Sequence, residues 1–194
     1  MNLLSSTSVF GFYTLISRVL GYLRDILIAI LLGTTIYADA FFVAFRLPNT
    51  FRRLFAEGTF NAAFIPSYAK TNLKNKKEGK IFADEVFNLL LYILIFIIII
   101  VEIFTPVVVY LIAPGFFADS EKLSLAVEFT RITFPFLLFV SLSSMLAGIL
   151  NTNNKFAAAA AAPIALNIVL IFSLLLAFNL ELNIAKSLSV GVTL

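Results

Sequence analysis

The chain has 194 residues, of which 61% are apolar and 13% charged, and its formal net charge is +3. A soluble domain is typically about half apolar and about one quarter charged, so this composition excludes a disordered chain and argues against a water-soluble globule. The chain has no cysteine and no histidine, which excludes disulfides, cysteine nucleophiles and the commonest general base and metal ligand. We therefore expect a membrane protein that is not an enzyme, with no catalytic residue, metal, cofactor or nucleic-acid partner.

Long apolar blocks follow one another along the chain. A helix needs about 20 residues to cross a hydrocarbon core of about 30 Å. Four blocks clearly reach that length: residues 9–32, 87–113, 132–150 and 156–178. A fifth block, residues 36–64, contains Pro48, which removes a backbone donor and predicts a broken or bent helix running to about Ile65. Residues 187–194 have the character of a sixth helix that stops in mid-span, so we expect residues 1–194 to be a truncated part of a longer protein.

The sequence therefore predicts an all-α fold, a polytopic membrane helix bundle of about six transmembrane helices. Its orientation follows from the distribution of lysine, because short lysine-rich loops stay in the cytoplasm. The predicted connecting segment 66–80 carries Lys70, Lys74, Lys76, Lys77 and Lys80. With alternating sides, segments 66–80 and 151–155 and the N-terminus are cytoplasmic, and segments 33–38, 114–122 and 179–186 face outward.

The first apolar block contains charges that a membrane helix should avoid. Arg18, Arg24 and Asp25 lie inside it, and each costs about 2.5–3.5 kcal/mol at the middle of a membrane. On a helical wheel they share one stripe about 140° wide with Ser17 and Gly21, and such a stripe should line a polar cavity. The alternative is that ion pairs merely anchor the helix. Adjacent residues point about 100° apart, so we expect Arg24 and Asp25 to pair poorly.

The second block carries a further set of polar side chains: Asp39, Arg46, Asn49, Arg52, Arg53 and Glu57. Purely structural roles are the alternative. Arg53 and Glu57 can neutralise each other, and the arginines can extend toward the membrane surface. Over the two blocks the arginines nevertheless outnumber the carboxylates. Guanidinium groups form forked hydrogen bonds to phosphate oxygens, so an anionic phosphate ligand is the predicted class. Asn167, in a later apolar block, is expected to hydrogen-bond between helices.

Two strings carry a resemblance to a known family: SRVLGYLRD at residues 17–25 and DAFFVAFRLPNTFRRLFAEG at residues 39–58. Together they closely resemble the N-terminal signature of the MurJ/MviN family of bacterial lipid II flippases, in the MOP exporter superfamily. APGF at residues 113–116 and ILNT at residues 149–152 resemble the same family. The resemblance covers essentially the whole chain and implies the N-terminal one of two six-helix lobes around a central cavity, with the second lobe absent.

The resemblance also implies roles for the polar residues of the first two blocks. We expect substrate binding by Ser17, Arg18, Arg24, Asp25, Asn49 and Arg52. We expect gating by Asp39, Arg46, Arg53 and Glu57.

The function implied is that of a multi-pass transporter in the bacterial cytoplasmic (inner) membrane. It would flip lipid II, an undecaprenyl-pyrophosphate-linked disaccharide-pentapeptide, from the inner to the outer leaflet by alternating access through a cationic cavity. Its other partners would be membrane lipids, with a coupling ion or the membrane potential as the energy source. The alternatives are another exporter of the superfamily, such as a polysaccharide-lipid flippase or a drug antiporter, and a non-transporting scaffold subunit. An antiporter for cationic drugs should have an acidic cavity, which the arginines oppose.

Overall fold

The structure, a computed structural model, describes residues 3–52, 59–153 and 155–194. Every regular element in these ranges is a helix, which confirms the predicted all-α fold. The elements are, in chain order, α1 (Leu3–Leu32), α2 (Ile36–Arg52), α3 (Thr59–Lys74), α4 (Lys76–Ile103), α5 (Thr105–Ile112), the 3₁₀ helix η2 (Pro114–Ala118), α6 (Ser120–Thr133), α7 (Phe136–Thr152), α8 (Phe156–Asn179) and α9 (Ile184–Thr193).

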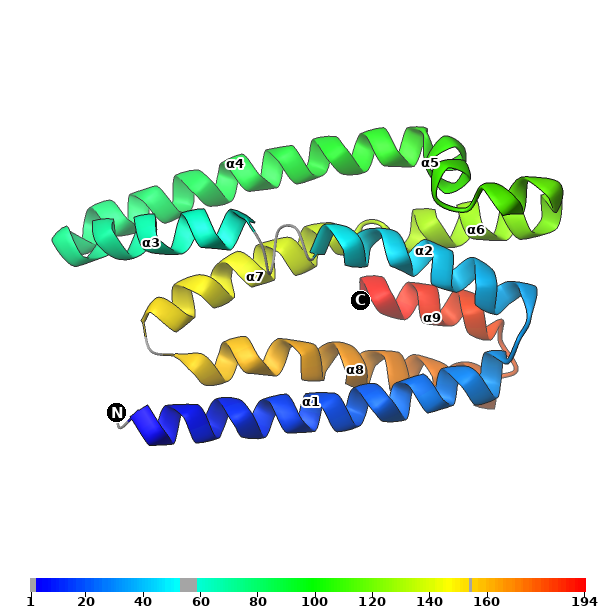
Figure 1. Cartoon of the computed structure of the whole chain (residues 1–194), viewed down its shortest axis with the longest axis horizontal. Coiled ribbons are helices and arrows are strands. Elements are labelled where there is room, and N and C mark those ends of the chain that lie inside the picture. Colours follow the sequence, from blue (N-terminus) through cyan, green and yellow to red (C-terminus); the bar gives the residue numbers. More distant parts are fainter. Residues whose placement is uncertain (1–2, 53–58, 154) are drawn as a thin grey trace.

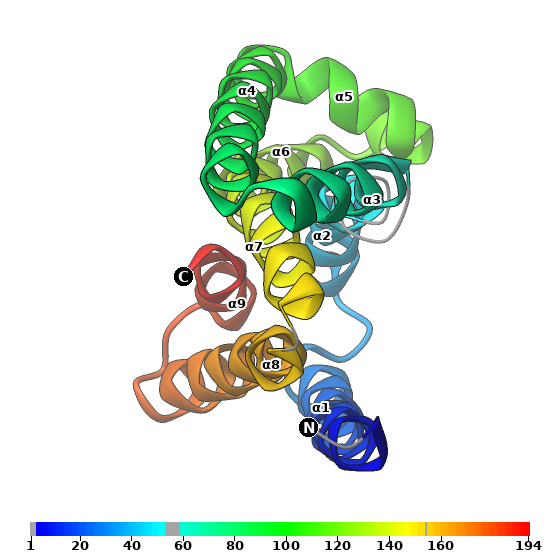
Figure 2. The same ribbon diagram turned by 90° about the vertical axis from the view of Figure 1, so that its left-hand side faces the viewer.

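The helices form two groups, which are visible end-on in Figure 2. In the first group, α1 packs along α8. In the second, α2 packs against α6, α3 against α4, and α4 against α7. Helix α9 contacts α8 and α6, and α7 also contacts α8, so these two helices connect the groups. The charged helix α1 thus lies at the edge of the bundle, with α8 as its main neighbour.

Two apolar clusters hold this arrangement together. One joins the end of α1 to α2, α6, α8 and α9, with Phe41, Phe129 and Leu174 at its centre. The other joins the end of α2 to α3, α4 and α7 around Phe134 and Leu137. Inside a membrane such clusters hold helices together by close van der Waals packing, because lipid tails are as apolar as the side chains themselves. Helix α2 contributes to both clusters and therefore connects them.

Pro48 lies inside α2 without breaking it, whereas this block was predicted to be one broken or bent helix running to about Ile65. The helix continues to Arg52, and a separate helix, α3, begins at Thr59. A proline cannot donate to the carbonyl four residues before it, which here is the carbonyl of Ala44. The hydroxyl of Thr133 in α6 lies 3.2 Å from that carbonyl oxygen and 2.9 Å from the Phe129 carbonyl of its own helix, so its single proton is shared between the two acceptors.

The lysine-rich segment 66–80 was predicted to be a connecting loop, and this prediction is wrong. The segment is helical except at Asn75, where α3 gives way to α4. The side chain of Asn75 accepts a hydrogen bond from the backbone N–H of Lys77 and so caps α4. Gly79 lies directly against Asn72 of α3. An N-cap and a glycine together allow a one-residue turn, so no longer loop is needed.

Within the described residues, three stretches are long and apolar enough to cross a membrane: Lys76–Ile103, Ser120–Thr152 and Ala160–Asn179. The first is α4, whose outer face exposes large apolar side chains, among them Leu89, Tyr92, Phe96, Ile99 and Ile103. A face of this kind is stable in lipid and unstable in water. The predicted block 87–113 is divided at Phe104, between α4 and α5. Pro106, in the first turn of α5, explains the division, because proline is tolerated where a helix begins.

The connections of the bundle are sorted to two ends, as Figure 1 shows. The links from α1 to α2, from α5 to α6 and from α8 to α9 lie at one end. The start of α1, the turn from α3 to α4 and the link from α7 to α8 lie at the other. Successive connections therefore lie at alternating ends of the bundle, as the order of the apolar blocks predicted. The side of the membrane that each end faces remains a prediction.

Candidate functional site

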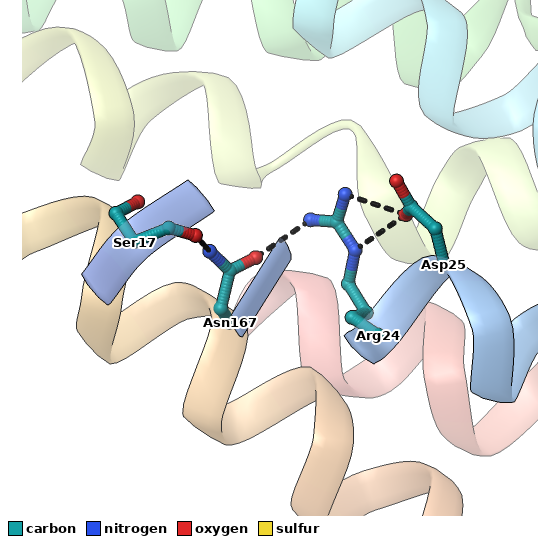
Figure 3. A network of polar contacts seen from close by, with 4 residues as sticks. All are labelled: Ser17, Arg24, Asp25 and Asn167. Carbon is teal, nitrogen blue, oxygen red and sulfur yellow. Dashed lines mark hydrogen bonds and ion pairs between the residues drawn. The ribbon is translucent and has the colours of Figure 1, made fainter. Parts of the chain in front are cut away.

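The centre of the candidate site is the guanidinium of Arg24, on the face of α1 that packs against α8. Nε and Nη2 donate to one carboxylate oxygen of Asp25, at 3.0 and 2.8 Å. Nη1 donates to the side-chain oxygen of Asn167 in α8, at 2.8 Å (Figure 3). Arg24 is therefore held from two directions, by its neighbour in the chain and by a helix 143 residues later.

Asn167 also fastens α8 to the preceding turns of α1. Its amide nitrogen donates to the backbone carbonyl of Ser17 at 3.1 Å (Figure 3). Gly21 lies between Ser17 and Arg24 on the same face, and a Cβ atom placed on it would lie 3.6 Å from the Asn167 amide nitrogen. A small residue at this position therefore leaves room for the amide. The prediction that Asn167 hydrogen-bonds between helices is confirmed.

Arg24 keeps part of its hydrogen-bonding capacity. A guanidinium has five N–H donors, and three of the Arg24 donors are used by Asp25 and Asn167. One N–H on each terminal nitrogen has no partner among the described residues. The Arg24 side chain is 20% exposed and that of Asp25 is 65% exposed. A partly shielded guanidinium with two unused donors is suited to an anion with several oxygens, such as a phosphate.

The prediction that Arg24 and Asp25 would pair poorly is wrong. It considered only the directions of the two Cα–Cβ bonds, which differ by about 100° on a helix. The arginine side chain is long enough to bend along the helix surface, so its Nε edge reaches the neighbouring carboxylate (Figure 3). The pair is mostly exposed on the Asp25 side, so it contributes little to stability, about 1 kcal/mol or less. Its main effect is to orient the guanidinium.

The remaining polar residues of the α1 stripe divide between two environments. Ser17 is half-buried against α8 and contributes its backbone carbonyl to the site. Arg18 is exposed, and its side chain has no hydrogen bond or ion pair within the described ranges. The stripe is therefore not a single surface: Ser17, Gly21 and Arg24 pack toward α8, whereas Arg18 and Asp25 are open.

Asp39, Arg46 and Asn49, the predicted residues of the second block whose side chains the structure describes, do not join the Arg24 site. Asp39, in the first turn of α2, pairs with Lys122 of α6 at 2.5 Å. Lys122 also lies 4.9 Å above the ring of Phe116. Arg46 is exposed on α2, with no side-chain partner in the described part of the chain, and Asn49 is half-buried near the end of the helix.

Three predicted residues cannot be placed. Arg52 ends α2, and its side chain lies outside the described part of the structure. Arg53 and Glu57 lie in the range 53–58, which is outside the described residues. Within the described ranges, no cluster of three or more acidic side chains could hold a metal ion.

Sequence reasoning missed two of these pairings. The apolar surroundings of Asn167 marked it as a residue that joins helices, but no local signal identified Arg24 as its partner. No local signal marked Lys122 either. Its ion pair with Asp39 depends on how α2 packs against α6.

The ion pair between Asp39 and Lys122 predicts a charge-swap result. Lys122→Glu and Asp39→Lys should each lower the free energy of unfolding by about 1 kcal/mol, because each places like charges together. Combining them should restore most of the loss. Thermal unfolding in detergent, followed by circular dichroism, measures this coupling. Simple addition of the two losses in the double variant would contradict the assignment.

The chain was compared with known proteins and families. The sequence model of the family described as "Lipid II flippase MurJ" matches residues 28–194. A "Probable lipid II flippase MurJ" of Rickettsia prowazekii (strain Madrid E) is 45% identical over 190 residues, 97% of this chain and 38% of that protein. The protein of the same description from Rhizobium tropici is 47% identical over 176 residues, 90% of this chain and 33% of that protein.

A solved structure described as "Lipid II flippase MurJ, inward closed conformation" superimposes with a TM-score of 0.81 at 32% identity. The match covers 95% of this chain and 38% of that one. The chain thus spans less than two fifths of the length of these relatives. Because the family model matches most of the chain and the fold agrees, the chain belongs to the MurJ family of lipid II flippases.

Proposed function

We propose that this chain forms the N-terminal lobe of a flippase that moves lipid II from the inner to the outer leaflet of the bacterial cytoplasmic membrane. The family membership supports the choice of substrate, and the apolar outer faces of the helices support a place in a membrane. The relatives are more than twice as long as this chain, so a second lobe would complete the transport path. We expect residues 1–194 to contribute one wall of that path.

The observation that carries the proposal is the pre-oriented guanidinium of Arg24. Lipid II contains a diphosphate, whose oxygens accept forked hydrogen bonds from arginine. Two donors of Arg24 remain available in a side chain already held by Asp25 and Asn167. Little conformational entropy is then lost when the anion binds. Arg18, Arg52 and Asn49 would supply further contacts to the headgroup.

The polyprenyl tail would remain in lipid while the headgroup enters the protein. Exposing apolar chain to water costs about 0.8 kcal/mol for each CH₂ group, so a tail of many carbons cannot follow the headgroup into a wet cavity. The helices flanking the Arg24 site would therefore have to let the tail protrude sideways. Helix α1 lies at the edge of the bundle, which suits such an opening.

The proposed mechanism is alternating access through a cationic cavity between two lobes. The lobes would rock around the bound headgroup and expose it first to one side of the membrane and then to the other. The ion pair of Asp39 with Lys122 lies at the end of the bundle where α1 meets α2. We propose that it helps to close that end, and that Arg46, Arg53 and Glu57 also act in gating.

The lysine-rich turn between α3 and α4 supports a cytoplasmic location for its end of the bundle, and therefore for the N-terminus. Movement of net charge across the membrane would couple the cycle to voltage, at about 2.3 kcal/mol per charge per 100 mV. The membrane potential or an ion gradient would then provide the energy.

Two experiments test the proposal. Native mass spectrometry of the purified chain in detergent should detect binding of lipid II and of undecaprenyl diphosphate, and much weaker binding of undecaprenol, which lacks phosphate. In addition, a chimaera in which this chain replaces the matching segment of a full-length relative should restore growth to cells depleted of their flippase. Equal binding of undecaprenol and undecaprenyl diphosphate, together with no growth, would refute the proposal.

A further inference from the structure

The side-chain amide of Asn167 is buried and both of its ends are used. The residue Asn167 is 6% exposed. The nitrogen donates to the carbonyl of Ser17, and the oxygen accepts from Nη1 of Arg24. Burying an amide without partners costs about 1–3 kcal/mol in proteins, so a buried amide with both ends satisfied is a specific arrangement. Figure 3 shows the three residues as one chain of contacts across α1 and α8.

The Ser17 carbonyl determines which way this amide points. A carbonyl only accepts hydrogen bonds, so the NH₂ group of Asn167 must face it. The oxygen of the amide is then directed toward Arg24, which only donates. In the reversed orientation two donors would face each other at Arg24 and two acceptors at Ser17. The backbone of α1 therefore sets the orientation of the group that holds the α1 arginine.

The two partners of Arg24 differ in charge. Asp25 is anionic and cancels part of the guanidinium charge, whereas Asn167 is neutral and holds the group without cancelling any. A second carboxylate at residue 167 would give Arg24 two anionic partners, and the group would then carry a net negative charge that repels an anion. With the neutral amide, Asp25 is the only anionic partner of Arg24 among the described residues, and two N–H donors stay unused.

We propose that Asn167 is the positioning residue of the anion site: its neutral amide holds the Arg24 guanidinium in the geometry that receives a diphosphate headgroup. This inference rests on the proposed function. Asn167 acts through Arg24 and needs no contact with the substrate. The role therefore differs from that of a residue which merely joins two helices.

The test measures binding of undecaprenyl diphosphate to the full chain by native mass spectrometry. Asn167→Leu, which removes both hydrogen bonds, should weaken binding about tenfold, the size expected for one lost hydrogen bond to a charged group. In an Arg24→Lys background the same substitution should change the affinity by less than about twofold, because the oriented guanidinium is already gone. Thr133→Val, which removes a buried inter-helix bond far from Arg24 in the sequence, serves as the matched control and should bind normally.

Asn167→Asp provides a second variant of nearly the same size. It keeps an acceptor beside Arg24 but adds a negative charge, and binding should again fall about tenfold while the circular dichroism spectrum stays that of the parent. This variant decides the question if Asn167→Leu fails to fold.

The outcomes separate the two proposals. Failure of the unsubstituted chain to bind the diphosphate lipid would refute the proposed function itself. Normal binding by Asn167→Asp, or an equal loss from Asn167→Leu with and without Arg24→Lys, would leave the proposed function in place and overturn the positioning role.

Discussion

Replacing Arg24 by alanine is expected to reduce the affinity of the chain for undecaprenyl diphosphate by about a hundredfold. Each charge-assisted hydrogen bond contributes about 1.5–3 kcal/mol, and two donors of this guanidinium are available to the ligand. The substitution also leaves the buried oxygen of Asn167 and the carboxylate of Asp25 without their partner. Titration by native mass spectrometry measures the loss, and the same variant in the chimaera should fail to support growth of flippase-depleted cells.

Arg24→Lys separates charge from geometry in the same assay. Lysine keeps the positive charge but presents a single ammonium in place of a planar fork. We expect a loss of about tenfold, intermediate between the parent and the alanine variant. Affinity equal to the parent would show that charge alone is recognised. Full affinity in Arg24→Ala would remove Arg24 from the binding site.

Replacing Gly79 by alanine is expected to destabilise the fold by about 2 kcal/mol, although alanine is the better helix former. A Cβ atom at this position would lie 2.7 Å from the Cα atom of Asn72, which is a backbone atom of α3. Overpacking of this kind costs about 1–3 kcal/mol, with backbone clashes at the upper end, and the gain in helix propensity of about 1 kcal/mol offsets only part of it. Thermal unfolding in detergent should show a lower midpoint.

Gly115→Ala is the matched control for this substitution. A Cβ atom on Gly115, in η2, would have no neighbouring atom within 4 Å, so the free energy of unfolding should stay within about 0.5 kcal/mol of the parent. If Gly79→Ala melted at the same temperature as Gly115→Ala, α3 and α4 would not approach each other as closely as the structure describes.

Pro48 and Gly79 both show how packing between helices accommodates residues that disfavour a helix. Pro48 frees the carbonyl of Ala44, and α6 places the Thr133 hydroxyl 3.2 Å from it. Gly79 lets α4 approach the backbone of α3. In a hydrocarbon environment no water is available to satisfy a freed backbone group, so neighbouring helices must do it. Residues that look like helix breakers in the sequence can therefore lie inside intact helices.

Much of the fold follows from the sequence alone, because hydropathy and helix length are local properties. The apolar blocks predicted the positions of α1, α4, α7 and α8, and the alternation of their ends agrees with Figure 1. Pro48 was predicted to break or bend the helix, but it lies inside α2, where α6 places the Thr133 hydroxyl 3.2 Å from the carbonyl of Ala44. The predicted loop at 66–80 was wrong because the Asn75 cap and the close approach of Gly79 to Asn72 allow a one-residue turn.

From the sequence alone it follows that this is a helical membrane protein, that Arg24 lies inside a helix where a charge is expensive, and that the chain resembles the MurJ family. The partners of the polar groups are defined only by the fold, which brings Asn167 to Arg24, Lys122 to Asp39, and the Thr133 hydroxyl near the carbonyl of Ala44. The physical reason is that composition and periodicity specify one helix at a time. The pairing of side chains depends on how two helices rotate and pack against each other, which no single segment encodes.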